Sequence, residues 1–152
     1  MQGAKYRLVM AAIGGATVLF GGLLVVLGIM GAFQLSDRPT KRLFASMKLG
    51  GPFDLSDWLR HWYLACATVA AGGGALVIGG VAIALRKRWG FLVVASTIVL
   101  NESSSWIAEA TGYARYPYEH PHWVESTFWL LMACVALYGY LATRDRSAVV
   151  TE

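Results

Sequence analysis

Four long apolar blocks dominate this chain, near residues 8–33, 61–85, 90–112 and 122–142. Each holds about 20 residues or more, and at about 1.5 Å per residue a helix of that length crosses a hydrocarbon core of about 30 Å. Lipid offers no water to bond the backbone, so each block is expected to be a helix, which satisfies its own N–H and C=O groups. The blocks predict an all-α integral membrane four-helix bundle, a single transmembrane domain over residues 1–152.

The composition agrees with a membrane protein, because only 14% of the residues are charged, against roughly 25% in a soluble domain. Lys5 and Arg7 precede the first block, as basic residues precede the core of a signal peptide. A signal core has about 7–15 apolar residues, and this block is much longer. We therefore expect it to be retained as the first helix.

Basic residues in the loops predict the orientation of the helices. Lys and Arg accumulate in the short cytoplasmic loops of membrane proteins, and the tight turn 86–88 between the second and third blocks is Arg-Lys-Arg. Lys5, Arg7, Arg144 and Arg146 fall on the same side, whereas the hairpin 113–121 carries only one basic residue. Both termini are therefore expected in the cytoplasm. The net charge of +4 follows from this loop bias and requires no nucleic-acid partner.

Glycines line the first two blocks. Gly14, Gly21 and Gly28 recur every seven residues in the first block, and the second contains 72–74 and 79–80 as glycine runs. Small residues let helix backbones approach closely, and close approach is a common means of helix association in lipid. The two helices are expected to pack on each other or, alternatively, on a foreign subunit or a second copy.

Two smaller features complete the architecture. Basic and apolar residues alternate over 39–49, which predicts a short amphipathic helix in the first outer loop, lying in the headgroup region. Cys66 and Cys134 are expected at depths that differ by roughly 9 Å. That separation is too large for a disulfide, so both are predicted to be small buried side chains.

The third block carries the strongest indication of a specific site. After a dozen mostly apolar residues, Asn101 and Glu102 open a polar run that ends in three serines. Ionisable groups at membrane depth are costly and usually face a bundle interior or a cavity. Glu109 lies seven residues further on, about 20° away around the helix, with Ser105 and Trp106 between them on that face. A carboxyl group at this depth is either protonated or paired with a cation, and an alternative, purely structural role is a hydrogen bond to a neighbouring helix.

All three histidines belong to the same predicted outer side. His61 opens the second block, while His120 and His122 flank a proline before the fourth, where Glu125 follows. Imidazole with carboxylate is ordinary ligation for zinc, copper or iron. His-Pro-His has no fixed ligand geometry, however, and neither HExxH nor ExxH accompanies it, so no metal ligand is predicted and no cofactor is assigned. The predicted ligand-binding residues are Glu102, Glu109, His61, His122, Glu125 and Trp106.

Two functions fit these features. The glycine faces, the short chain and the lack of a catalytic motif favour a non-catalytic subunit or scaffold of a membrane complex or homo-oligomer. The alternative is a membrane-embedded small-molecule, lipid or ion site, used for transport or by an enzyme, in the outer half of the bundle around Glu102 and Glu109. The expected partners are the lipid bilayer and other membrane subunits or copies of the chain.

Overall fold

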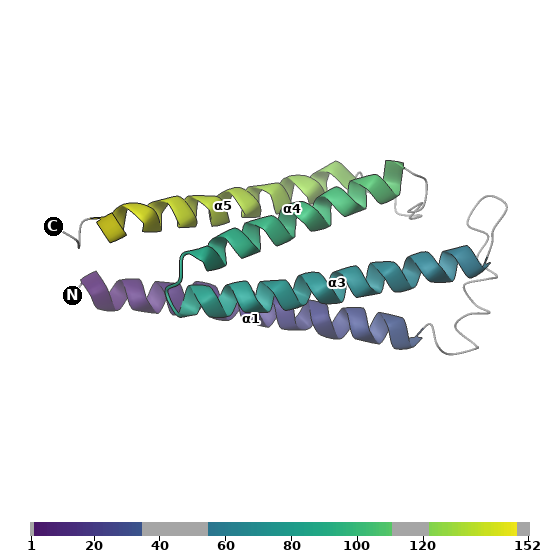
Figure 1. Ribbon diagram of the computed structural model, residues 1–152, viewed down its shortest axis with the longest axis horizontal. Coiled ribbons are helices and arrows are strands. Elements are labelled where there is room, and N and C mark those ends of the chain that lie inside the picture. Colours follow the sequence, from purple (N-terminus) through teal and green to yellow (C-terminus); the bar gives the residue numbers. More distant parts are fainter. Residues whose placement is uncertain (1, 35–54, 111–121, 149–152) are drawn as a thin grey trace.

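The computed structural model describes residues 2–34, 55–110 and 122–148 of the chain. Within these ranges the protein is all-α, with four helices (Figure 1): α1 (Gln2–Gln34), α3 (Leu55–Ala84), α4 (Trp89–Ala110) and α5 (His122–Ala148). Each contains a stretch long and apolar enough to cross a membrane. The prediction of an all-α chain with such helices is confirmed. The amphipathic segment predicted at 39–49 lies outside the described residues.

Three of the four helices, α1, α3 and α5, are longer than the apolar blocks that predicted them. α1 begins at Gln2 rather than near residue 8, α3 begins at Leu55 rather than near 61, and α5 continues to Ala148 rather than ending near 142. The added turns carry charged residues such as Arg7 and Arg60. Arginine and lysine are good helix formers, so the backbone ladder continues past the point where hydrophobicity stops.

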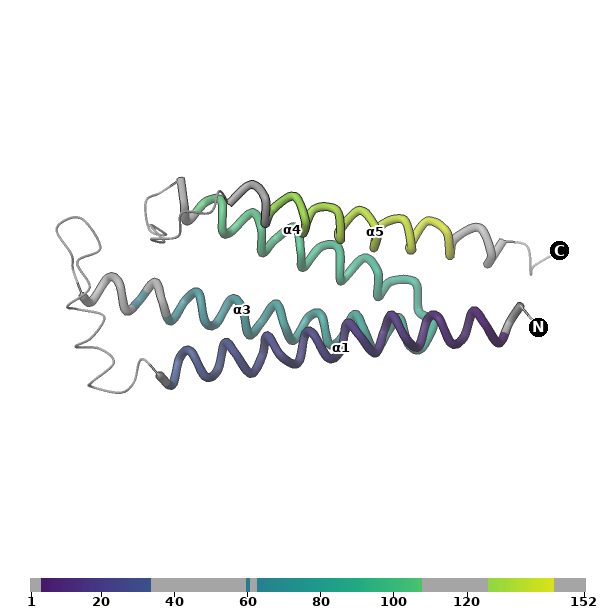
Figure 2. The backbone as a smooth tube through the Cα atoms, turned by 180° about the vertical axis from the view of Figure 1, so that it is seen from behind, coloured from purple at the N-terminus to yellow at the C-terminus, as the bar shows by residue number. Residues whose placement is uncertain are grey.

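Consecutive helices pack against each other in an up-and-down order, α1 on α3, α3 on α4 and α4 on α5. The beginning of α1 and the end of α5 therefore lie at the same end of the molecule (Figure 1). The view from behind shows two helix pairs, α1 with α3 and α4 with α5 (Figure 2). The pairs are close near the turn between α3 and α4 and diverge along the described parts of the helices toward the opposite end.

Glycines bring α1 and α3 into backbone contact. A Cβ atom built on Gly21 would lie 2.6 Å from the carbonyl oxygen of Gly73, and one built on Gly73 would lie 2.6 Å from that of Gly21. The same approach recurs one heptad away in each direction. We call the set the glycine seam: Gly14 against Gly80 and Ala84, Gly21 against Gly73, and Gly28 against Cys66 and Ala70.

The seam shows that these glycines pack α1 on α3, the first of the two roles expected from the sequence. Its contacts repeat every seven residues along both helices, in opposite directions, as in an antiparallel pair with a period of about 3.5 residues per turn. The glycines of the seam therefore pack within the chain. Gly15, Gly22 and Gly74 lie off the seam and would find nothing within 4 Å of an added Cβ atom.

A second close contact joins α3 to α4 beside their connecting turn. A Cβ atom on Gly90 would lie 2.5 Å from the carbonyl oxygen of Gly79. Beneath this contact, Met10, Ile83 and Phe91 form a buried cluster. The cluster links α1, α3 and α4 at this end of the bundle.

The cysteines are both free, as the expected difference in depth predicted. Cys66 is buried on the α1 side of α3, and a Cβ atom on Gly31 would lie 3.0 Å from its sulfur. The prediction of a buried role is wrong for Cys134, which is exposed. Its neighbour Ala133 is 3% exposed, and consecutive helical residues point about 100° apart, so Cys134 turns away from the packed face.

The turn that ends α3 is built around a strained residue. The N–H of Lys87 donates to the carbonyl oxygen of Ala82 (2.8 Å), and that of Arg86 donates to the carbonyl oxygen of Ile83 (2.8 Å). This pair of bonds is the Schellman pattern, which requires a left-handed residue after the helix. Arg86 takes that position with a φ of 63°, where glycine would carry no steric cost.

Replacing Arg86 with glycine is expected to stabilise the protein by about 1 kcal/mol, because the left-handed conformation costs a side chain roughly that much. Lys87→Gly is the matched control, since it also removes one cation but replaces a residue that is not in the left-handed conformation. Unfolding by denaturing detergent in mixed micelles measures both. Equal effects of the two substitutions would contradict the strain at Arg86.

Candidate functional site

Glu102 forms the polar contact between α4 and α5. The hydroxyl of Ser126 donates a hydrogen bond of 2.8 Å to Oε2 of Glu102. The two side chains are only 6% and 3% exposed. A carboxyl group removed from water needs such partners, because an unpaired polar group there is costly. The sequence predicted that Glu102 would face the bundle interior or a cavity, but it did not identify Ser126 as its partner.

Three other hydroxyls near Glu102 are directed to their own helix. Ser104 and Ser105 donate to the carbonyl oxygen of Asn101, at 2.7 Å and 3.2 Å, and Thr97 donates to that of Val93 at 2.8 Å. Bonds from Ser and Thr to a carbonyl three or four residues earlier are common in helices and carry no chemistry of their own. Glu102 is therefore the member of the polar run whose hydrogen bond crosses to another helix.

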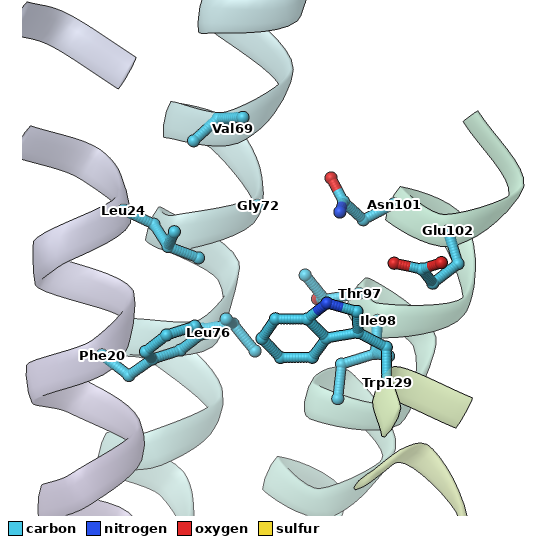
Figure 3. Close-up of a pocket in the computed structure, with 10 residues that line it drawn as sticks. All are labelled: Phe20, Leu24, Val69, Gly72, Leu76, Thr97, Ile98, Asn101, Glu102 and Trp129. Carbon is cyan, nitrogen blue, oxygen red and sulfur yellow. The ribbon is translucent and has the colours of Figure 1, made fainter. Parts of the chain in front are cut away.

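A cavity of about 100 Å³ lies between the two helix pairs, and Glu102 is in its wall. Figure 3 shows the lining side chains, which come from all four described helices. They are Phe20 and Leu24 from α1, Val69, Gly72 and Leu76 from α3, Thr97, Ile98, Asn101 and Glu102 from α4, and Trp129 from α5. The walls are mainly apolar, with a few polar groups gathered on the α4 side, which is the usual make-up of a small-molecule site.

Two aromatic rings bridge the helix pairs at this cavity. The rings of Phe20 and Trp129 have centroids 5.6 Å apart, and Phe128 packs edge-on against Trp129 at 5.3 Å. In Figure 3 the indole reaches from α5 toward Phe20, across the space below Asn101 and Glu102. The contact between Phe20 and Trp129 ties α1 to α5, so the space between the pairs is partly filled by aromatic surface.

Two polar groups at the cavity have no protein partner in the part of the chain that the structure describes. They are the side-chain amide of Asn101 and the indole N–H of Trp129. The Asn101 side chain extends toward the cavity beside Glu102 (Figure 3). The cavity thus offers hydrogen-bonding groups that its own walls do not use.

Among the described residues that line the cavity, none is basic. The basic side chains that the structure describes lie near helix ends: Lys5, Arg7, Arg60, Arg86, Lys87 and Arg88. Arg88 is held over the ring of Tyr140, with its guanidinium carbon 5.3 Å from the ring centroid. Glu102 consequently has no positive partner among the residues that line the cavity.

The predicted site residues are brought together only in part. Glu102 lines the cavity, but Trp106, one turn further along α4, is 47% exposed and is not among the lining residues. Glu109, His61, His122 and Glu125 lie in the described helices, while their side chains, like all of His120, lie outside what the structure describes. Their convergence stays a prediction.

The sequence pointed to the polar side of the cavity and missed its aromatic side. No role at the site was predicted for Trp129, and Phe20 carried no signal because it sits in a uniformly apolar block. Both contribute to the site only through the way α1 and α5 approach each other. Among the described residues, no group of three or more His, Cys, Asp or Glu side chains is placed to hold a metal ion.

Comparison of the chain with protein-family models, with curated proteins and with solved structures gives no match. Its function must therefore be inferred from the residues of the cavity.

The hydrogen bond between Ser126 and Glu102 yields a test of its own. Ser126→Ala is expected to lower the free energy of unfolding by about 1–2 kcal/mol, because the carboxyl group then loses its partner on α5. Glu102→Gln should cost less, since the glutamine carbonyl can accept the same bond. Ser104→Ala is the matched control, because that exposed hydroxyl bonds only its own helix. Equal stability of the two alanine variants, measured by unfolding in mixed micelles, would refute the role given to Ser126.

Proposed function

We propose that this chain is a multi-pass membrane protein that binds a small molecule in the cavity between its two helix pairs. In this proposal the four helices span the bilayer, both termini are cytoplasmic, and the cavity lies in the outer half, around Glu102. The composition of the four helices and the basic turn at 86–88 support the membrane arrangement.

The observation that carries the proposed site is the cavity itself. Its apolar walls include polar groups with unused hydrogen-bonding capacity, at Asn101 and Trp129, next to the buried carboxyl group of Glu102. Asn101 and Trp129 are half-buried, and polar groups without partners are costly against apolar surface unless a ligand satisfies them. A ligand that fills this space would remove that cost.

A larger side chain introduced at Gly72 can fill the cavity. A Cβ atom on Gly72 would lie 3.8 Å from Cγ2 of Thr97, an ordinary contact, so a larger side chain can enter the cavity without displacing backbone. Gly72→Leu is expected to abolish ligand binding while the helices stay folded. Gly74→Leu is the matched control, since that position on the same helix faces open space.

Native mass spectrometry of the protein purified in mild detergent is the readout. The wild-type protein and Gly74→Leu are expected to carry a bound small molecule that Gly72→Leu lacks. Identical spectra for all three proteins, with no bound species removed by Gly72→Leu, would contradict the proposed site.

The second candidate is a non-catalytic subunit or scaffold of a membrane complex or homo-oligomer. The first and last helices favour this role, because few of their residues are buried against the rest of the chain. Only 11% of the apolar stretch of α1 and 17% of that of α5 is buried. The same native spectra separate the candidates. A stoichiometric second polypeptide or a second copy, unaffected by Gly72→Leu, would support the subunit role.

A further inference from the structure

We infer that the ligand of the cavity is a small organic ammonium ion, with its charged head against Glu102 and its alkyl groups against the apolar wall. This inference rests on the proposed function and adds the chemical class of the ligand. It follows from the charge, the surface and the size of the cavity.

The charge of the lining favours a cation. Glu102 is 6% exposed and, from the described part of the chain, accepts one hydrogen bond, which the neutral hydroxyl of Ser126 donates. No basic residue lines the cavity in the ranges 2–34, 55–110 and 122–148 that the structure describes. Opposite charge is the partner that favours a carboxylate in an apolar surrounding, and a bound cation supplies it. An anionic ligand would instead meet a carboxyl group with no lining cation to offset it.

The surface of the cavity favours an organic cation over a metal ion. Cations such as calcium take six or more oxygen ligands, whereas most of this wall is carbon, from residues such as Leu24, Val69 and Leu76. The aromatic rings of Phe20 and Trp129 lie at the same cavity. Aromatic rings attract alkylammonium groups, and the carbonyl of the unpaired Asn101 amide can accept a second N–H.

The size of the cavity limits the ligand. An engineered cavity of about 150 Å³ binds benzene, so a cavity of about 100 Å³ takes roughly four or five non-hydrogen atoms. tert-Butylammonium is of this size. tert-Butanol has the same shape and the same number of non-hydrogen atoms but no charge, so the pair isolates the contribution of the charge.

The experiment titrates each probe into the full-length protein in neutral detergent micelles, followed by ligand-observed NMR. Wild-type protein is expected to bind tert-butylammonium at least about tenfold more tightly than tert-butanol, because charge-assisted hydrogen bonds are about twice as strong as neutral ones. Glu102→Gln should bring this ratio to about one while changing the affinity for the alcohol little. The glutamine can still accept from Ser126, and a thermal melt verifies that the variant is folded.

The outcomes separate the ligand class from the site. An equal or stronger affinity for the alcohol in the wild-type protein, with binding lost in Gly72→Leu, would overturn the ammonium assignment and leave the proposed function standing. If neither probe binds, or if binding is the same in Gly72→Leu, the proposed function and the inference are both wrong. Retention of the preference for the cation in Glu102→Gln would also overturn the assignment.

Discussion

Alanine at Gly21 is expected to lower the free energy of unfolding by about 2 kcal/mol, because it forces α1 away from α3. Its Cβ atom would lie 2.6 Å from the carbonyl oxygen of Gly73 and 2.9 Å from the backbone nitrogen of Val77. Both of these are backbone atoms of α3, which cannot move aside as a side chain can. The seam is the main contact of α1 within the chain, so its loss also weakens the attachment of the first helix.

Gly22 provides the control for this substitution. It is the next residue of the same helix, and a Cβ atom there would meet nothing within 4 Å. Gly22→Ala should therefore leave stability unchanged or raise it by up to about 1 kcal/mol through better helix propensity. Unfolding in mixed micelles measures both variants, and equal losses at the two positions would show that the seam does not join the helices.

The partner residue sharpens the test, because Gly73→Ala meets the same contact from the other helix. Once one alanine has separated the backbones, the second should cost little. The Gly21→Ala, Gly73→Ala double variant is therefore expected to lose clearly less than the sum of the single losses, as holds for residues that share one contact. Additive losses would place the two glycines in independent environments.

Phe91→Ala is expected to cost about 3 kcal/mol, the lower end of the usual range for truncating a buried phenylalanine. Phe91 is 5% exposed and packs with Met10 and Ile83, so its removal leaves a void in the buried cluster. The lower end applies because, for helices that span a bilayer as proposed, the loss is of packing contacts rather than of burial from water. Phe128→Ala is the matched control, since that ring is 56% exposed.

A double-mutant cycle with Gly139 tests whether the stability lost in Phe91→Ala comes from the packing of α5 on this ring. A Cβ atom on Gly139 would lie 2.7 Å from Cε1 of Phe91, so Gly139→Ala should be destabilising in the wild-type protein and nearly neutral beside Phe91→Ala. Unfolding of the four proteins gives the coupling. A Gly139→Ala cost that is the same in both backgrounds would contradict the packing of α5 on this ring.

The sequence by itself determined that the chain forms four long apolar helices. Apolar blocks of this length leave few alternatives, because the backbone must bond itself wherever water is excluded. The seven-residue spacing of Gly14, Gly21 and Gly28 likewise predicted a helix contact surface, since only small residues permit such close approach. The polar run at Glu102 predicted where a specific site would lie, because an ionisable group in an apolar segment is costly whichever residues surround it.

Only the tertiary structure decided what these features meet. Glycine spacing is compatible with a contact inside the chain or with another copy, and the choice depends on the combined fit of α1 and α3 over several turns. Ser126 as the partner of Glu102, and Phe20 and Trp129 as the aromatic side of the cavity, come from segments far apart in the sequence. Their meeting depends on the rotation of each helix about its axis, which is set by side-chain packing among all the helices at once. A local sequence pattern does not specify that packing.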